Sequence, residues 1–208
     1  IDIAAFVANF RHAKALAPGC KALAVVKANA YGHGAVPLAR ALDAEADAFG
    51  VACSEEALEL RAAGIERPIL LMEGVFDPDE IGVAAARGLV LTVHSRAQLD
   101  WLLDARLPTP VDVWLKIDTG MHRLGFAPAQ LREVYHLLHA SRNVRQIVLM
   151  SHFACADDTD NPATERQAEQ FASATRGIGA PRCLANSAAV LAWPRTHGDW
   201  IRPGIMLY

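Results

Sequence analysis

The stretch from Val25 to Gly34 carries the most distinctive chemistry of the sequence. It reads VVKANAYGHG, and its lysine, Lys27, follows the apolar run ALAVV, which is typical of a buried strand. A lysine at the carboxyl end of a strand is well placed to act as a nucleophilic amine, as attachment of an aldehyde cofactor requires. Most lysines simply extend their charge into solvent, so Lys27 alone does not define a site.

Four later apolar runs are also followed by residues that can take part in chemistry. These residues are Lys116 and Arg123, Ser151 and His152, Asn186 and Ser187, and Arg202, Gly204 and Ile205. A single histidine is most often structural, and an Asn-Ser pair can be an ordinary helix cap. Because parallel barrels place their chemistry at the carboxyl ends of the strands, the five strand ends together indicate one site.

The last two strand ends predict a phosphate site. Ser187 and Gly204 follow the seventh and eighth expected strands, where barrels frequently bind phosphate through backbone amides. A phosphate site combined with a strand-end lysine and several arginines points to a phosphorylated cofactor that binds through an aldehyde. Pyridoxal 5'-phosphate (PLP) fits this description.

Strand-like and helix-like segments alternate along the chain. The expected strands cover residues 22–26, 48–52, 68–72, 89–93, 111–117, 144–150 and 182–184, and an eighth begins at 200–201. The expected helices cover residues 2–16, 35–42, 78–87, 95–103, 128–138 and 164–176, with another from residue 54 to the terminator Gly64. Since no two strands are close enough for a hairpin, the pattern predicts an α/β fold, a (β/α)8 TIM-type barrel. An open doubly wound sheet is the alternative, which the lack of a G-x-G-x-x-G motif disfavours.

Two helix starts are predicted in detail. Ser54 is expected to cap the helix that it opens, with Glu55 and Glu56 in the first turn. Asp77 is expected to cap the next helix, with Pro78 at its first position.

The composition limits the class of protein. The 208 residues are 52% hydrophobic, and the net charge of -3 leaves no basic footprint for nucleic acid. No apolar run approaches the ~18 residues that span a bilayer, and the four scattered cysteines form no zinc or redox motif. We therefore expect a cytoplasmic protein without a membrane partner or metal. The absence of an initial methionine and the abrupt end at Tyr208 predict that residues 1–208 are one domain of a longer, two-domain chain.

The string VVKANAYGHG resembles the PLP-lysine motif of the bacterial alanine racemases, and the resemblance extends over essentially the whole chain. Its other blocks are KIDTGMHRLG at 116–125, SHF at 151–153, NSAA at 186–189 and WIRPGIMLY at 200–208. The resemblance implies that the chain is the cofactor-binding barrel of that family. It also implies interconversion of L- and D-alanine, which supplies D-alanine for peptidoglycan.

The resemblance assigns roles to the strand-end residues. Lys27 would hold PLP as a Schiff base and act as the base on one face of the substrate, while Arg123 would bind the substrate carboxylate. Arg202 would face the pyridine nitrogen, with His152 beside it in a hydrogen-bonded network. The remaining cofactor contacts would come from Tyr31, Asn186, Ser187, Gly204 and Ile205. Lys116 matches a position that carries a carbamylated lysine in some members.

The same resemblance predicts a part that the sequence does not show. The second base of the family is a tyrosine of a C-terminal β-domain, and it comes from the partner subunit of a homodimer. Tyr135 lies in the middle of an expected helix and is no substitute for it.

Two other functions remain open from the sequence. A non-catalytic PLP carrier would share the barrel without a β-domain. A broad-specificity amino-acid racemase or a decarboxylase would share the barrel and the cofactor.

Overall fold

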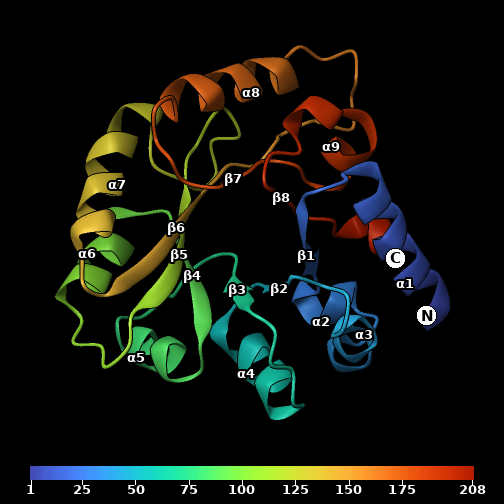
Figure 1. Ribbon diagram of the computed structural model, residues 1–208, viewed down its shortest axis with the longest axis horizontal. Coiled ribbons are helices and arrows are strands. Elements are labelled where there is room, and N and C mark those ends of the chain that lie inside the picture. Colours follow the sequence, from blue (N-terminus) through green and yellow to red (C-terminus); the bar gives the residue numbers. More distant parts are fainter.

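The computed structural model describes residues 1–208, and its eight parallel strands form a closed barrel in chain order (Figure 1). The strands are β1 (Lys21–Val25), β2 (Ala48–Val51), β3 (Ile69–Leu71), β4 (Leu89–Val93), β5 (Val111–Lys116), β6 (Val144–Met150), β7 (Arg182–Cys183) and β8 (Trp200–Ile201). Lys21 pairs with Trp200 and Ala22 with Ile201, so β8 closes onto β1. The closure confirms the TIM-type barrel and excludes the open doubly wound sheet.

Helices follow the strands and surround the barrel (Figure 1). They are α1 (Ile3–Leu16), α2 (Lys27–Tyr31), α3 (Ala35–Leu42), α4 (Ser54–Ala62), α5 (Asp79–Ala86), α6 (Arg96–Asp104), α7 (Leu131–Ala140), α8 (Ala163–Ala174) and α9 (Ser187–Ala192). Three short 3-10 helices cover Pro128–Gln130, Pro194–Thr196 and Ile205–Leu207. No helix combines the length and the apolar character that crossing a membrane requires.

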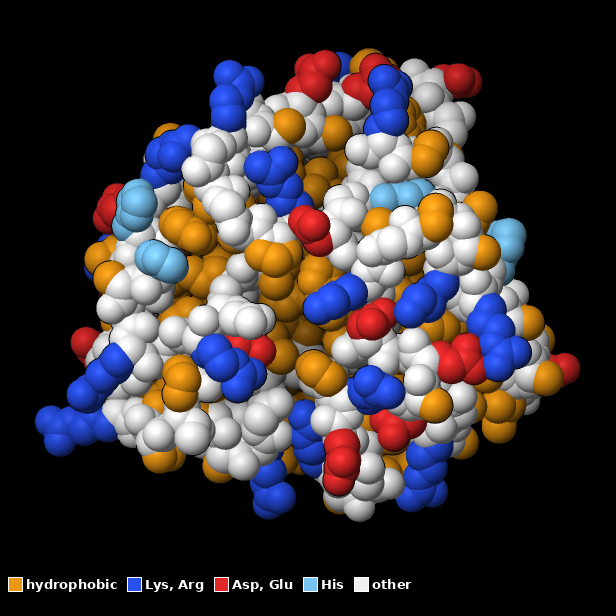
Figure 2. All heavy atoms as spheres, viewed as in Figure 1, with side chains coloured by type: hydrophobic (Ala, Val, Ile, Leu, Met, Phe, Trp, Pro, Cys, Tyr) orange, Lys and Arg blue, Asp and Glu red, His pale blue; other side chains and the backbone are white.

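The apolar runs of the sequence are explained by burial on both faces of each strand. In β1, Leu23 and Val25 belong to the cluster inside the barrel, whereas Ala22 and Ala24 belong to the larger cluster between strands and helices. Parallel strands covered on both sides require apolar residues at successive positions. In the face shown in Figure 2, hydrophobic side chains lie in a central hollow, with basic and acidic side chains interspersed around it.

The helix α1, near the start of the chain, packs against the last residues of the chain. Asp2 caps it by accepting hydrogen bonds from the amides of Ala4 and Ala5. Its buried face includes Phe6, whose ring centroid lies 5.3 Å from that of Tyr208. The Tyr208 hydroxyl donates to the Val25 carbonyl oxygen, which ties the last residue to the end of β1.

The two predicted capping residues were wrong, whereas Glu55 and Glu56 do lie in the first turn of α4 as expected. Cys53 is the residue that precedes α4, and the Ser54 hydroxyl donates to the Glu80 carboxylate instead of capping its own helix. The helix α5 begins at Asp79, one residue later than expected, and is preceded by Pro78. Asp77 accepts a hydrogen bond from the Asp79 amide, so it forms a local turn ahead of the helix.

The chain makes a left-handed turn directly after β1, which the sequence did not predict. Ala28, Asn29, Ala30 and Tyr31 have φ angles between +51° and +54°. Such values are costly for residues with a side chain, so a run of them persists only where other contacts enforce it. Gly32 follows at φ +86°, a value that glycine adopts without the cost of a side chain.

Candidate active site

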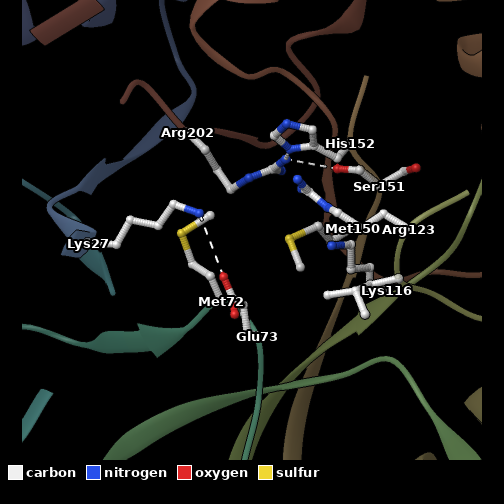
Figure 3. A pocket seen from close by; sticks show the side chains of 10 residues that line it. Lys27, Met72, Glu73, Lys116, Arg123, Met150, Ser151, His152 and Arg202 are labelled. Carbon is white, nitrogen blue, oxygen red and sulfur yellow. Dashed lines mark hydrogen bonds and ion pairs between the residues drawn. The ribbon is translucent and has the colours of Figure 1, made fainter. Parts of the chain in front are cut away.

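Five predicted residues from four parts of the barrel line one cavity of about 200 Å³ (Figure 3). They are Lys27, Lys116, Arg123, His152 and Arg202. Lys27 extends from the end of β1 on one side, and the other four side chains lie across from it or above it in this view. The sequence prediction that the strand ends meet at one place is confirmed in this geometry.

Glu73 also lines this cavity, and the sequence reasoning missed it. Its carboxylate lies 3.8 Å from the Lys27 amine. Its backbone carbonyl accepts hydrogen bonds from His94 Nε2 and Gln98 Nε2, which fixes the chain after β3. Glu73 follows directly on the apolar run ILLM at 69–72. A polar residue after an apolar run was the signal that identified the other strand-end residues, and it could have identified Glu73 too.

The left-handed turn that carries Lys27 is held by side chains from two places. Asn29 Oδ1 accepts a hydrogen bond from the Ala35 amide. Glu56, in the first turn of α4, accepts from the amides of Ala28 and Ala52 at 2.7 and 2.8 Å. A single carboxylate therefore joins the turn after β1 to the end of β2, and Lys27 leaves a backbone that cannot shift freely.

Lys116 is buried at the end of β5 and is 7% exposed. Burial, with Arg202 and Arg123 close by, lowers the pKa of its amine to about 8. The amine is therefore more often neutral near pH 8 than an ordinary lysine would be.

The loop that follows β5 presents Arg123 to the cavity. Asp118 Oδ1 accepts hydrogen bonds from the amides of Gly120, Met121 and His122, and this organises the loop. Gly125 has a φ of +131°, and a Cβ there would lie 2.6 Å from the Asp118 nitrogen. The loop therefore needs both the aspartate and the glycine, and neither was among the predicted functional residues.

His152 is neutral at physiological pH. Burial, followed by the charges of Arg202 and Lys116, lowers the pKa of its imidazole to about 3. Its Nδ1 lies 3.2 Å from Arg202 Nη2 and accepts a hydrogen bond from it, because a guanidinium only donates. The predicted network of His152 and Arg202 is thus present.

Arg202 is 3% exposed, and its two terminal nitrogens are fully engaged. They donate to His152, to the carbonyls of Ser151, Cys183 and Leu184, and to the Cys183 sulfur. The Nε of the same guanidinium is buried and has no hydrogen-bond partner. A buried donor without an acceptor is costly, so this N–H is suited to an acceptor bound in the cavity.

A second cavity, of about 380 Å³, adjoins the first and shares Lys27 and Arg202 with it. Tyr31, Ser187 and Gly204 also line it. Ser187 Oγ accepts hydrogen bonds from the amides of Gly204 and Met206, which leaves its own O–H free to donate.

Two further predicted residues line this second cavity, Asn186 and Ile205. Asn186 caps α9 by accepting from the Ala189 amide, as an ordinary cap does. Ile205 is 63% exposed. All the predicted site residues therefore line one of the two cavities.

A closed parallel barrel with its polar groups gathered at the strand carboxyl ends defines the class of protein, a (β/α)8 barrel of the enzyme type. The family model described as "Alanine racemase, N-terminal domain" matches residues 1–208. The chain belongs to this family.

Individual relatives support this family membership. An alanine racemase of Pseudomonas entomophila is 53% identical over 208 residues, and a catabolic alanine racemase of Pseudomonas putida is 52% identical. The crystal structure of the biosynthetic alanine racemase from Pseudomonas aeruginosa has a TM-score of 0.97 at 49% identity. The structure of the alanine racemase from Acinetobacter baumannii has a TM-score of 0.93 at 41% identity. All of this chain is covered in each comparison, but it spans only 58% of each of these proteins.

Proposed function

We propose that the protein acts as a PLP-dependent racemase that interconverts L- and D-alanine. The observation that carries this proposal is that residues suited to each part of PLP line the second cavity together. Lys27, Tyr31, Ser187 and Arg202, whose Nε has no partner, all line it. Membership of the alanine racemase family supports the choice of alanine as substrate.

The residues present fit PLP. The Lys27 amine would bond to the aldehyde, Arg202 Nε would donate to the pyridine nitrogen, and Tyr31 and Ser187 would donate to the phosphate. Gly204 leaves room there, because a Cβ at this position would lie 2.7 Å from the Tyr31 hydroxyl oxygen. When bound, PLP supplies an electron sink that weakens the Cα–H bond of the amino acid.

The chain's own groups have separate tasks. Lys27 would exchange a proton with one face of the substrate α-carbon, and Arg123 would hold the substrate carboxylate. The Arg202 guanidinium keeps its proton, so the pyridine nitrogen would stay unprotonated. A weakened electron sink makes well-placed bases more important, and racemisation needs one on each face. The relatives have a further region that residues 1–208 do not cover. The second base would be a tyrosine in the corresponding region of a longer protein.

Further parts of the proposal rest on the family. We infer that the whole protein forms a homodimer in the cytoplasm and provides D-alanine for peptidoglycan, although two relatives are described as catabolic. Lys116 is a candidate for carbamylation, since the modification requires a neutral amine and the pKa of this lysine is lowered to about 8.

The test is borohydride trapping. The chain is incubated with PLP, reduced, digested and mapped by mass spectrometry, together with Lys27→Ala and the surface control Lys14→Ala. We expect a phosphopyridoxyl group on Lys27 in the unmodified chain and in Lys14→Ala, and none at this site in Lys27→Ala. Equal trapping on several lysines would contradict the proposal.

Activity of the longer protein separates the remaining functions. Racemisation of alanine that disappears in Lys27→Ala would support the racemase. Trapping on Lys27 without any turnover would favour a PLP carrier, and turnover of serine or lysine at rates near that of alanine would favour a broader specificity.

A further inference from the structure

The environment of Arg202 contains a side chain to which no role has been assigned. Cys183 lies in β7 and is 0% exposed, with Met150 of β6 and Trp200 of β8 as its strand partners. Its side chain belongs to the cluster inside the barrel, where the surrounding residues are apolar. The Cys183 sulfur is thus one of the few side-chain acceptors that can reach a guanidinium placed there.

Arg202 uses this sulfur. Arg202 Nη1 donates to the Cys183 carbonyl oxygen at 3.1 Å and to the Cys183 sulfur at 2.9 Å. On the other terminal nitrogen, the Ser151 carbonyl oxygen is the closest acceptor, at 2.8 Å. Both terminal nitrogens are therefore held by groups that belong to the barrel wall.

The consequence concerns the remaining donor of the guanidinium. A guanidinium is planar, so fixing both terminal nitrogens also fixes the direction of the Nε–H. That Nε–H is buried and unpartnered, and Arg202 lines both cavities. If the sulfur were removed, one Nη1 proton would lose an acceptor and the plane could rotate about the remaining contacts.

We propose that Cys183 is a positioning residue, which holds Arg202 so that its Nε–H is the one donor left for the ring nitrogen of the cofactor. The inference rests on the proposed function, because it concerns how PLP is bound. Burial raises the pKa of the Cys183 thiol, so the sulfur is neutral and does not cancel the positive charge of Arg202.

The test compares two cofactors in several variants. Equilibrium binding of PLP and of 1-deaza-PLP, in which a C–H replaces the ring nitrogen, is measured by quenching of tryptophan fluorescence. The variants are Cys183→Ala and Cys183→Val, which both lack the acceptor, and Cys183→Ser, which keeps one. Because Val fills more space than Ala, an effect shared by the two variants does not arise from lost volume.

The expected result is a change in the ratio of the two affinities. A hydrogen bond from a charged donor is worth about 1.5–3 kcal/mol. Misalignment that removes about 1 kcal/mol of it should lower the preference for PLP over 1-deaza-PLP about five-fold in Cys183→Ala and Cys183→Val. Cys183→Ser should keep the preference within about two-fold of the unmodified chain. A purely structural role would weaken both cofactors alike and leave the ratio unchanged, which would overturn the proposal.

The experiment distinguishes failure of the Cys183 proposal from failure of the proposed function. If the unmodified chain prefers PLP and the Ala and Val variants keep that preference, Cys183 has no positioning role while the proposed function stands. If the unmodified chain binds PLP no better than its deaza analogue, Arg202 does not contact the ring nitrogen and both proposals fail in this respect.

Discussion

Of all the lysines and arginines, only Lys116 and Arg202 are buried. Their positive charges lie close enough to repel each other. Arg202 is compensated by five acceptor atoms around its terminal nitrogens. No hydrogen bond or ion pair of this kind accompanies the Lys116 amine. Lys116 therefore lowers the stability of the fold when it is protonated, which is a common cost at functional sites.

Lys116→Met should stabilise the chain at low pH in buffer free of carbon dioxide. The folded pKa of about 8 lies below the unfolded value of 10.5, so the penalty is complete below pH 8 and disappears as the pH rises to 10.5. We expect a gain of about 1–3 kcal/mol in the free energy of unfolding by urea at pH 6, declining toward zero near pH 10.5. Lys21→Met, at an exposed lysine, should show no such trend. A loss of stability in Lys116→Met at pH 6 would contradict the prediction.

At the level of elements, the position of Lys27 depends on a turn that is stabilised by a residue of another βα unit. The left-handed segment Ala28–Tyr31 is unfavourable by itself. Glu56 compensates by accepting two backbone hydrogen bonds, one from this turn and one from the end of β2. The position of Lys27 is therefore set by the start of α4 as much as by β1.

Glu56→Ala should loosen this turn without unfolding the barrel. Loss of an acceptor for two amides should cost about 1–3 kcal/mol in stability. Hydrogen exchange of the Ala28 amide, followed by NMR, should accelerate at least about ten-fold. The matched control is Glu59→Ala on the exposed face of the same helix, which should leave both quantities nearly unchanged. Unaltered exchange at Ala28 in Glu56→Ala would show that the turn is held by other contacts.

For the whole molecule, the closure of the barrel joins the two ends of the sequence. The strand β8 pairs with β1, and Tyr208 contacts both Phe6 and Tyr31. A closed barrel has no free strand edge, so the last nine residues protect the first strand. This arrangement predicts that a destabilising substitution near residue 200 lowers the stability of the entire fold.

Ile201→Ala tests this cooperativity. Ile201 is 0% exposed, so the cavity that its truncation leaves should cost about 2–5 kcal/mol. Unfolding monitored by circular dichroism and by tryptophan fluorescence should shift equally, because the closure makes the transition common to all elements. Leu191→Ala, at a side chain 55% exposed, should shift neither. Separate transitions for the two probes in Ile201→Ala would show that the ends unfold independently.

The sequence by itself determined the order of strands and helices, because apolar runs buried on both faces are a local property of the chain. It also placed the candidate site residues, since each follows such a run directly or lies in the loop after it, and parallel strands end at the same face of a barrel. Lys27, Arg123, His152 and Arg202 were found in this way, and all four line one cavity.

Only the tertiary structure decided how these groups are held. The left-handed turn after β1, the carboxylate of Glu73 beside Lys27 and the sulfur of Cys183 beside Arg202 all depend on contacts between different βα units. The capping error at Ser54 has a related origin, because Ser54 bonds to Glu80 of the following unit. Local propensity cannot report such contacts, since they exist only after the barrel has closed.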